Sequence, residues 1–263
     1  MRFPIFQVDA FTDKLFQGNP AAVVLLDGPR DPVWMQLVAR EMNLSETAFA
    51  YPQTGGYRLQ WFTPETEVDL CGHATLATAH ILWEMERVNT TERIRFPTRS
   101  GWLSAEKKEE IIELDLPSAP LILGEVSEEI IKALGPVPDF VGISGEKWLL
   151  EYHDERVVRN MKPDFSALRE RSGRGLIVTA ISDKPGIDFV SRYFTPWIGI
   201  NEDPVTGSAH CILGPYWGAK LRKNHMTAYQ ASERGGIVHI RLSAERTYVG
   251  GKAITVFAGE LFG

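Results

Sequence analysis

One segment of the chain places a thiol, a glycine and an imidazole directly before a stretch that predicts a buried helix. These residues are Cys71, Gly72 and His73, and residues 74–83 after them are small or apolar almost throughout. The free N–H groups of a first helical turn carry about half a positive charge, so they favour anions and lower the pKa of a nearby imidazole. A neutral His73 that donates or relays a proton is one interpretation, and a histidine that caps or packs the helix is the other.

A second segment repeats this design in the other half of the chain. Thr206, Gly207 and Ser208 precede another apolar helix, and a Phe-Thr-Pro triplet stands upstream in both halves, at 62–64 and at 194–196. The copies are offset by 132 residues at the triplet and by 135 at the glycine, close to half of the 263 residues, which predicts an internal duplication. If the halves pack around a pseudo-twofold axis, both helix N-termini would face one cleft. A small carboxylated molecule is the natural occupant, because a glycine lets a ligand approach the backbone closely.

Two carboxyl groups could act beside these segments. Glu46 stands at the entrance to an apolar strand, where desolvation would raise its pKa toward the working pH of a general acid or base. From the sequence alone, a solvated glutamate at a strand edge is the commoner case. Asp203, three residues before Thr206, would be drawn toward the second helix N-terminus, or is a loop or capping aspartate, as Asp-Pro often is.

The elements that must position these residues mix strands and helices, with strands in the majority. Strands are predicted at 3–10, 21–26, 45–50 and 57–62, within 93–116, and at 175–181, 187–194, 226–232, 236–242 and 252–258. Helices are predicted at 32–43, 74–83, 127–135, 163–173 and from 207 onward. Residues 117–120 contain two prolines and are the best linker candidate. We therefore expect an α+β or α/β chain with mixed sheets.

Composition and charge exclude several classes of function. The chain carries 28 Lys+Arg against 34 Asp+Glu, a net charge of −6, with no basic stripe of the kind that nucleic-acid binders show. No window approaches ~20 uninterrupted apolar residues, so no membrane span is predicted. The first residues turn polar within ten positions and do not resemble a signal peptide. We expect a cytoplasmic protein that acts on a small molecule and binds neither nucleic acid nor membrane.

The sequence contains no pattern that is typical of a metal or cofactor site. Its two cysteines, Cys71 and Cys211, cannot build a disulfide framework, and no Cys-x-x-Cys or His-x-x-x-His pair accompanies them. No Gly-x-Ser-x-Gly elbow, Walker motif or dinucleotide fingerprint occurs either. We expect neither a metal ion nor an organic cofactor.

Motifs along the whole chain resemble the PhzF-like family of phenazine-biosynthesis proteins. The segments that carry this resemblance are residues 7–12, 16–23, 41–49, 62–64, 67–75, 203–210 and 230–236. The resemblance implies the diaminopimelate epimerase-like fold, in which two similar domains each wrap a barrel-like mixed sheet around a central helix. In this chain the domains would span 1–117 and 121–249, and a C-terminal strand within 250–263 would return to the first domain.

The resemblance also implies a cofactor-independent isomerase whose active site lies between the two domains. Glu46 falls on the family's proton-shuttling glutamate, which favours the catalytic interpretation of this residue over the solvated one. His73 and Asp203 would line the site and help to bind or polarise the substrate. Gly72, Gly207 and Ser208 would bind the substrate, and family members form homodimers. The family's named substrate is dihydrohydroxyanthranilate.

The cysteines separate this chain from related racemases. Proline racemase and diaminopimelate epimerase, which the fold resembles, use a cysteine at each of the two helix starts. Here Cys71 occupies the first position but Thr206 occupies the second, and a hydroxyl is far too weak an acid to replace a thiolate. Two alternatives remain open: a racemase or epimerase that uses Glu46 with another acid, and a non-catalytic small-molecule binder.

Overall fold

The computed structural model describes residues 1–263, which divide into two compact units. Unit 1 contains Met1–Leu116 and Tyr248–Gly263, and unit 2 contains Pro117–Thr247. Strand β16 (Arg246–Gly251) carries the chain from unit 2 back into unit 1. None of the helices is both long enough and apolar enough to cross a membrane.

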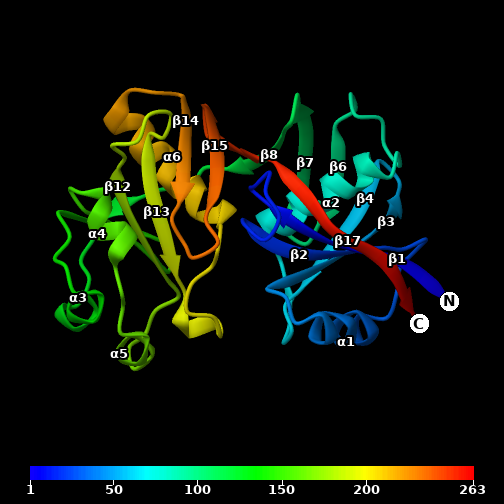
Figure 1. The fold of residues 1–263 in the computed structure, drawn as a ribbon, viewed down its shortest axis with the longest axis horizontal. Helices are drawn as coiled ribbons and strands as arrows, with labels where there is room; N and C mark the ends of the chain where they lie inside the picture. The colour runs from blue at the N-terminus through cyan, green and yellow to red at the C-terminus, as the bar shows by residue number, and fades with distance from the viewer. The chain divides into compact units, whose positions relative to one another are not determined.

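The six-stranded sheet of unit 1 has the order β17-β1-β2-β3-β4-β5. Its strands are β1 (Arg2–Ala10), β2 (Asn19–Leu25), β3 (Glu46–Gln53), β4 (Gly56–Phe62), β5 (Glu67–Val68) and β17 (Ala253–Phe262). The pair β2–β3 is parallel and the other pairs are antiparallel, so the sheet is mixed. The two ends of the chain lie side by side because β17 pairs with β1 along its whole length (Figure 1).

Helix α2 (Gly72–Glu84) is the buried helix of unit 1. It packs against β1, β2, β3 and β17 and against β7 of a three-stranded antiparallel meander. The meander consists of β6 (Ile94–Thr98), β7 (Gly101–Lys108) and β8 (Ile111–Pro117). Ten of the 13 helix residues are buried, as expected of a helix that is apolar on every side.

Helix α1 (Pro32–Met42) covers the outer side of unit 1 and is amphipathic (Figure 1). Asp31 caps it by accepting a hydrogen bond from the Val33 amide at 2.9 Å, and Asn43 ends it in the left-handed conformation. Its buried face packs in a hydrophobic cluster that includes Phe49 of the sheet. The helix predicted at 32–43 is confirmed to within one residue.

Unit 2 contains a seven-strand series with the order β15-β14-β13-β12-β11-β10-β9. The strands are β9 (Ile122–Leu123), β10 (Phe140–Ser144), β11 (Lys147–Glu151), β12 (Gly175–Ile181), β13 (Phe189–Phe194), β14 (His225–Gln230) and β15 (Gly236–Ser243). The pairs β11–β12 and β13–β14 are parallel and the rest are antiparallel. The strand predictions at 175–181, 187–194, 226–232 and 236–242 are thus confirmed to within three residues.

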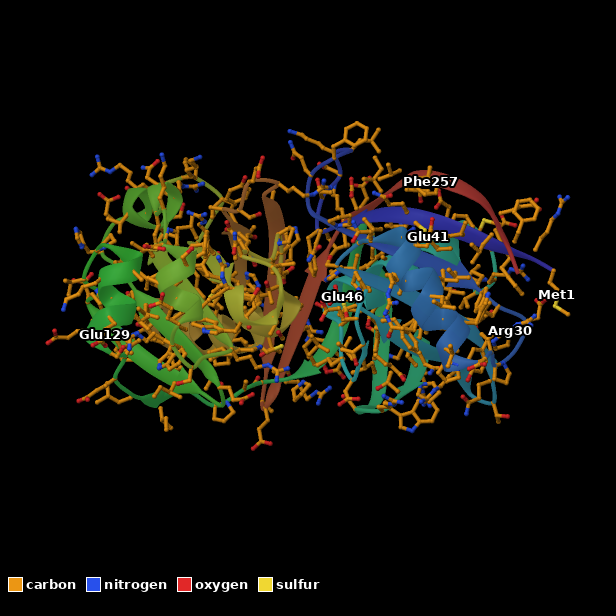
Figure 2. The ribbon with its side chains drawn as sticks, turned by 90° about the horizontal axis from the view of Figure 1, so that it is seen from below. Met1, Arg30, Glu41, Glu46, Glu129 and Phe257 are labelled. Atoms are coloured by element: carbon orange, nitrogen blue, oxygen red, sulfur yellow. The ribbon has the colours of Figure 1, made fainter.

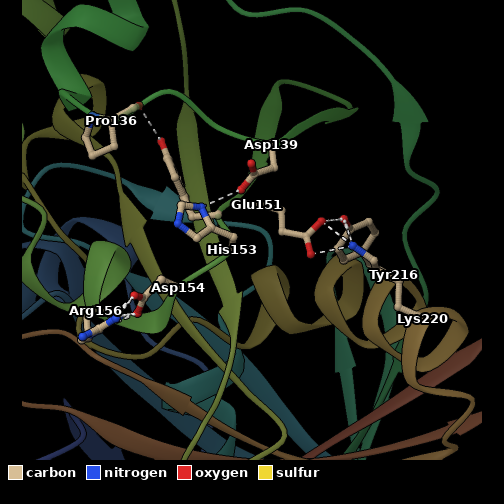
Figure 3. Close-up of polar contacts among 9 residues, drawn as sticks. Pro136, Asp139, Glu151, His153, Asp154, Arg156, Tyr216 and Lys220 are labelled. Carbon is tan, nitrogen blue, oxygen red and sulfur yellow. Dashed lines mark hydrogen bonds and ion pairs between the residues drawn. The ribbon is translucent and has the colours of Figure 1, made fainter.

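Helix α6 (Gly207–Leu221) is the long buried helix of unit 2, and it packs against β14 and β15. Trp217 donates a hydrogen bond from its indole N–H to Thr179 Oγ1 at 2.9 Å, and its ring stacks on Phe189. At the outer end of the helix, Tyr216 and Lys220 both donate to the carboxylate of Glu151 on β11 (Figure 3). Apolar packing and this ion pair hold α6 in place.

The short helices of unit 2 are the part of the fold that the sequence predicts least well. They are α3 (Glu128–Leu134), α4 (Glu155–Asn160), α5 (Phe165–Arg169) and the single turn η1 (Pro196–Ile198). The helix predicted at 127–135 is confirmed by α3, whereas the one predicted at 163–173 is much shorter. No element is predicted over 138–160, because Gly142 and Gly145 interrupt the apolar run. In the structure Gly145 lies in the turn between β10 and β11 with a positive φ. The prediction of an α+β chain with mixed sheets is confirmed.

Candidate active site

Unit 1 brings three side chains predicted from two separate segments into direct contact. Glu46 is the first residue of β3, and its Oε2 lies 3.1 Å from Nε2 of His73, the second residue of α2. The other ring nitrogen of His73 contacts the side-chain amide of Asn19 at 3.1 Å. Cys71, the N-cap residue of α2, places its Sγ 3.5 Å from His73 Nδ1. Figure 2 labels Glu46 and also Glu41, which lies on the exposed side of α1.

This cluster is buried but not sealed. His73 has 6% of its side chain exposed and Glu46 has 19%. No hydrogen-bond donor is aligned on Glu46 Oε2, so its contact with His73 is mainly one of charge. Bulk water is therefore largely excluded from the pair, although the Glu46 side chain keeps a small exposed fraction.

The ionisation of this pair differs from the sequence prediction. Desolvation predicts a raised pKa for Glu46, and one of the two interpretations of His73 is a neutral imidazole with a lowered pKa. Burial does raise the pKa of Glu46, but the charge of His73 and the polar contacts of the carboxyl group outweigh burial, and the pKa is lowered. Burial likewise lowers the pKa of His73, yet its contacts with Cys71 and Glu46 raise it well above 6.5. Glu46 is thus a carboxylate and His73 an imidazolium, because each favours the charged form of the other.

Stability should follow the ionisation of this pair. The folded protein holds the His73 proton above pH 6.5, where the unfolded chain releases it, so the pair loses its contribution as pH rises through the folded pKa of His73. The contribution is complete between pH 6.5 and pH 4.5, and it is lost again as pH falls through the folded pKa of Glu46. Between pH 6.5 and 9, wild type should lose up to ~1.4 kcal/mol per pH unit more than His73→Asn. Urea unfolding at both pH values measures this, and parallel losses in the two proteins would contradict the ion pair.

Cys71 is an unreactive thiol in this setting. Burial and the charge of Glu46 raise its pKa to about 11, although His73 acts in the opposite direction. Near neutral pH the group therefore stays protonated, and it cannot act as the thiolate base of a two-cysteine racemase. Glu46, Cys71 and His73 also place their donor atoms within 4.8 Å of one another, so they are the residues that could hold a metal ion. The other sulfur and imidazole groups of the two buried helices, His80, His210 and Cys211, do not join this set.

Cys71→Ser is expected to retain activity within ~10-fold of wild type, because the thiol takes no proton from the substrate. Cys71 should also resist iodoacetamide at pH 7.5 for as long as the protein is folded, and the buried Cys211 should behave alike. Mass spectrometry of the alkylated protein checks both, with a urea-unfolded sample as the fully reacting control. Rapid labelling of Cys71 with loss of activity would contradict this assignment.

Unit 2 positions Asp203 and Thr206 through a buried glutamine. The Thr206 hydroxyl donates to Asp203 Oδ2 at 2.5 Å. Gln230, at the end of β14, accepts from the Thr206 amide at 2.9 Å and donates to the Asp203 carbonyl at 2.8 Å. Because Gln230 is completely buried, these bonds fix the loop that enters α6.

Ser208 lies in the first turn of α6, one residue after Gly207. Its Oγ accepts a hydrogen bond of 2.9 Å from Nζ of Lys147, the first residue of β11. The N-cap residues of both buried helices, Cys71 and Thr206, make no side-chain cap bond. In each helix the side chain of the cap residue therefore accepts no hydrogen bond from the first-turn amides. The pKa of Lys147 is lowered, because burial outweighs the opposing effects of Cys211 and Asp203.

Three of these residues were not singled out from the sequence. Asn19 and Gln230 lie inside the motifs that carry the family resemblance, and that was the available signal. Lys147 stands in no motif, and the hairpin that carries it is not predicted from the sequence. Each was missed because its partner lies far away along the chain.

Comparison with known proteins decides the family. The family model described as phenazine biosynthesis-like protein, PhzC-PhzF, matches residues 8–259. The chain belongs to the PhzC-PhzF family. An uncharacterised isomerase of Halalkalibacterium halodurans is 53% identical, with 99% of each chain covered. A crystal structure of a PhzF-family protein from Enterococcus faecalis matches with a TM-score of 0.95 at 44% identity, and 100% of each chain is covered.

More distant structures share the fold alone. A probable proline racemase from Agrobacterium radiobacter is 12% identical, with a TM-score of 0.66 over 99% of this chain and 93% of that one. Relatives of this PhzC-PhzF chain in H. halodurans and Pseudomonas aeruginosa are named isomerases. The chain is accordingly an enzyme of the isomerase type, built on a fold that racemases also use.

Proposed function

We propose that this PhzC-PhzF protein is a cofactor-independent isomerase that moves a proton within a small carboxylated metabolite. The observation that supports this most directly is the ionised, largely buried Glu46 beside His73. A carboxylate that is shielded from water is suited to take a proton from carbon. The model reaction for this proposal is the dihydrohydroxyanthranilate isomerisation associated with PhzF.

In the proposed reaction Glu46 removes a proton from an activated carbon and returns it at another position of the same molecule. The imidazolium of His73 keeps Glu46 ionised before the transfer, and its positive charge stabilises negative charge that develops on the substrate. No cofactor is required, because acid–base transfer needs only groups that can take and return a proton. Cys71 stays protonated throughout.

The remaining predicted residues are assigned to substrate binding or polarisation. Asp203 shares a hydrogen bond with Thr206, so its carboxyl group is held in one orientation at the entrance to α6. Ser208 supplies a hydroxyl group in the first turn of that helix. Gly72 and Gly207 begin the two buried helices, where a side chain would limit the approach of a ligand to the backbone.

A screen of carboxylated metabolites in D₂O tests the proposal. Proton NMR should show deuterium entering one metabolite while its double bond or acidic hydrogen changes position. Deuterium that enters with inversion at a single carbon would identify a racemase or epimerase instead. A metabolite that binds without taking up deuterium would identify a non-catalytic binder, and both outcomes would overturn the proposed isomerisation.

A further inference from the structure

Three side chains of the candidate site offer three different kinds of metal ligand at one point of unit 1. Glu46 supplies a carboxylate oxygen, Cys71 a sulfur and His73 a ring nitrogen, and these atoms all lie within 4.8 Å of one another. Proteins bind Zn²⁺ with these kinds of atom, whereas Mg²⁺ and Ca²⁺ prefer ligand sets made of oxygen. The donor set therefore favours zinc, although the spacing of these residues along the chain matches no zinc motif.

The distances around His73 suit a tetrahedral ion. Nε2 of His73 lies 3.1 Å from Glu46 Oε2 and 3.9 Å from Cys71 Sγ. In a tetrahedral site with Zn–N and Zn–O bonds of ~2.1 Å and a Zn–S bond of ~2.3 Å, neighbouring ligand atoms are ~3.4 to 3.6 Å apart. Both separations differ from these values by a few tenths of an ångström, which small side-chain rotations can supply.

The carboxylate and the imidazole are already arranged for such a role. Oε2 of Glu46 is buried and accepts no aligned hydrogen bond, so its lone pairs remain available to an ion. The side-chain amide of the buried Asn19 contacts His73 Nδ1 at 3.1 Å. A zinc-binding imidazole is usually held in this way, by a partner on the nitrogen that does not bind the metal. Asn19 thus orients the ring, and Nε2 faces the carboxylate.

We propose that Glu46, Cys71 and His73 form a zinc site, and that Zn²⁺ bound there inhibits the enzyme. Binding displaces the thiol proton of Cys71 and one proton of the His73 imidazolium into solvent. Carboxylate and thiolate then balance the two positive charges of the ion, so the buried cluster has no net charge before or after binding. Zinc is an inhibitor here because it occupies the carboxylate that takes the proton. The inhibition rests on the proposed function, whereas the binding does not.

Cobalt serves as a coloured substitute for zinc in the full-length protein, after metal has been removed with a chelator. Titration with Co²⁺ should produce a thiolate-to-cobalt charge-transfer band and the intense visible bands of tetrahedral cobalt, and Zn²⁺ should remove them by displacement. Cys71→Ser should lose the charge-transfer band and bind Co²⁺ more than ~100-fold more weakly, since even losing a residue behind a ligand costs ~10- to 100-fold. Cys211→Ser removes the other free cysteine, in unit 2, and should leave the titration unchanged.

X-ray absorption of wild type with one equivalent of Zn²⁺ tests the site without any variant. The zinc should have one sulfur neighbour at ~2.3 Å and nitrogen or oxygen neighbours at ~2.0 to 2.2 Å. Zinc without a sulfur neighbour would overturn the proposal. So would a cobalt charge-transfer band that persists in Cys71→Ser, or a wild-type protein that binds neither metal.

Deuterium uptake in the presence of zinc separates this site from the proposed function. Saturating Zn²⁺ should abolish uptake by wild type, the chelator should restore it, and Mg²⁺ at the same concentration should have no effect. If the sulfur-bound metal forms but no metabolite exchanges a proton, the zinc site stands and the isomerase proposal fails. If exchange is observed and zinc slows wild type and Cys71→Ser alike, the ion acts elsewhere and the present proposal fails alone.

Discussion

Replacing Glu46 with glutamine is expected to reduce deuterium uptake into the substrate by ~10²- to 10⁴-fold, with KM nearly unchanged. Glutamine has almost the same shape as glutamate but cannot take a proton from carbon. The group that it replaces is ionised and 19% exposed, so the lost property is basicity rather than packing. Deuterium wash-in followed by NMR measures the rate, and substrate titration of the variant measures binding.

Glu41→Gln is the matched control for this experiment. Glu41 precedes Glu46 by five residues but lies on the exposed side of α1 (Figure 2), so its replacement should leave exchange at the wild-type rate. Thermal unfolding of both variants shows that each remains folded at the assay temperature. Undiminished exchange in Glu46→Gln would remove Glu46 from the mechanism.

His73→Asn is expected to lower the rate at neutral pH by ~10- to 100-fold and to move the acidic limb of the pH–rate profile upward. In wild type the positive charge of His73 opposes the effect of burial and keeps the pKa of Glu46 below 4.5. Without that charge burial dominates, so Glu46 holds a proton up to a higher pH and is inactive as a base there. The profile of kcat/KM from pH 4 to pH 9 measures the shift.

His80→Asn provides the control on the same helix. His80 lies two turns beyond His73 and contacts Thr255 and Glu84 instead of the candidate site. Its replacement should leave the acidic limb in place. A profile of His73→Asn that falls in height without moving along the pH axis would show that His73 does not set the ionisation of Glu46. The double variant Glu46→Gln/His73→Asn should be more stable than His73→Asn, because it leaves no unpaired buried carboxylate.

Local sequence signals predict most of the fold, because they act over a few residues. Asp31-Pro32 and Asn43 mark the two ends of α1, and the uninterrupted apolar run after Gly72 marks α2 as a buried helix. The hairpin β10–β11 and helix α4 were missed. Their sequences lack a clear hydrophobic period, and the packing of unit 2 stabilises them instead.

The candidate site shows the same division between local and tertiary information. The sequence by itself determined the family, the α+β class and the identity of Glu46, His73, Asp203 and Ser208 as candidates. It could not determine their protonation, because the pKa of Glu46 depends on a histidine 27 positions away that only the contact between β3 and α2 brings to 3.1 Å. It could not identify Lys147 either, since the partner of that residue lies 61 positions further along the chain. Residue types restrict the chemistry that is available, whereas distance and burial decide which groups carry charge.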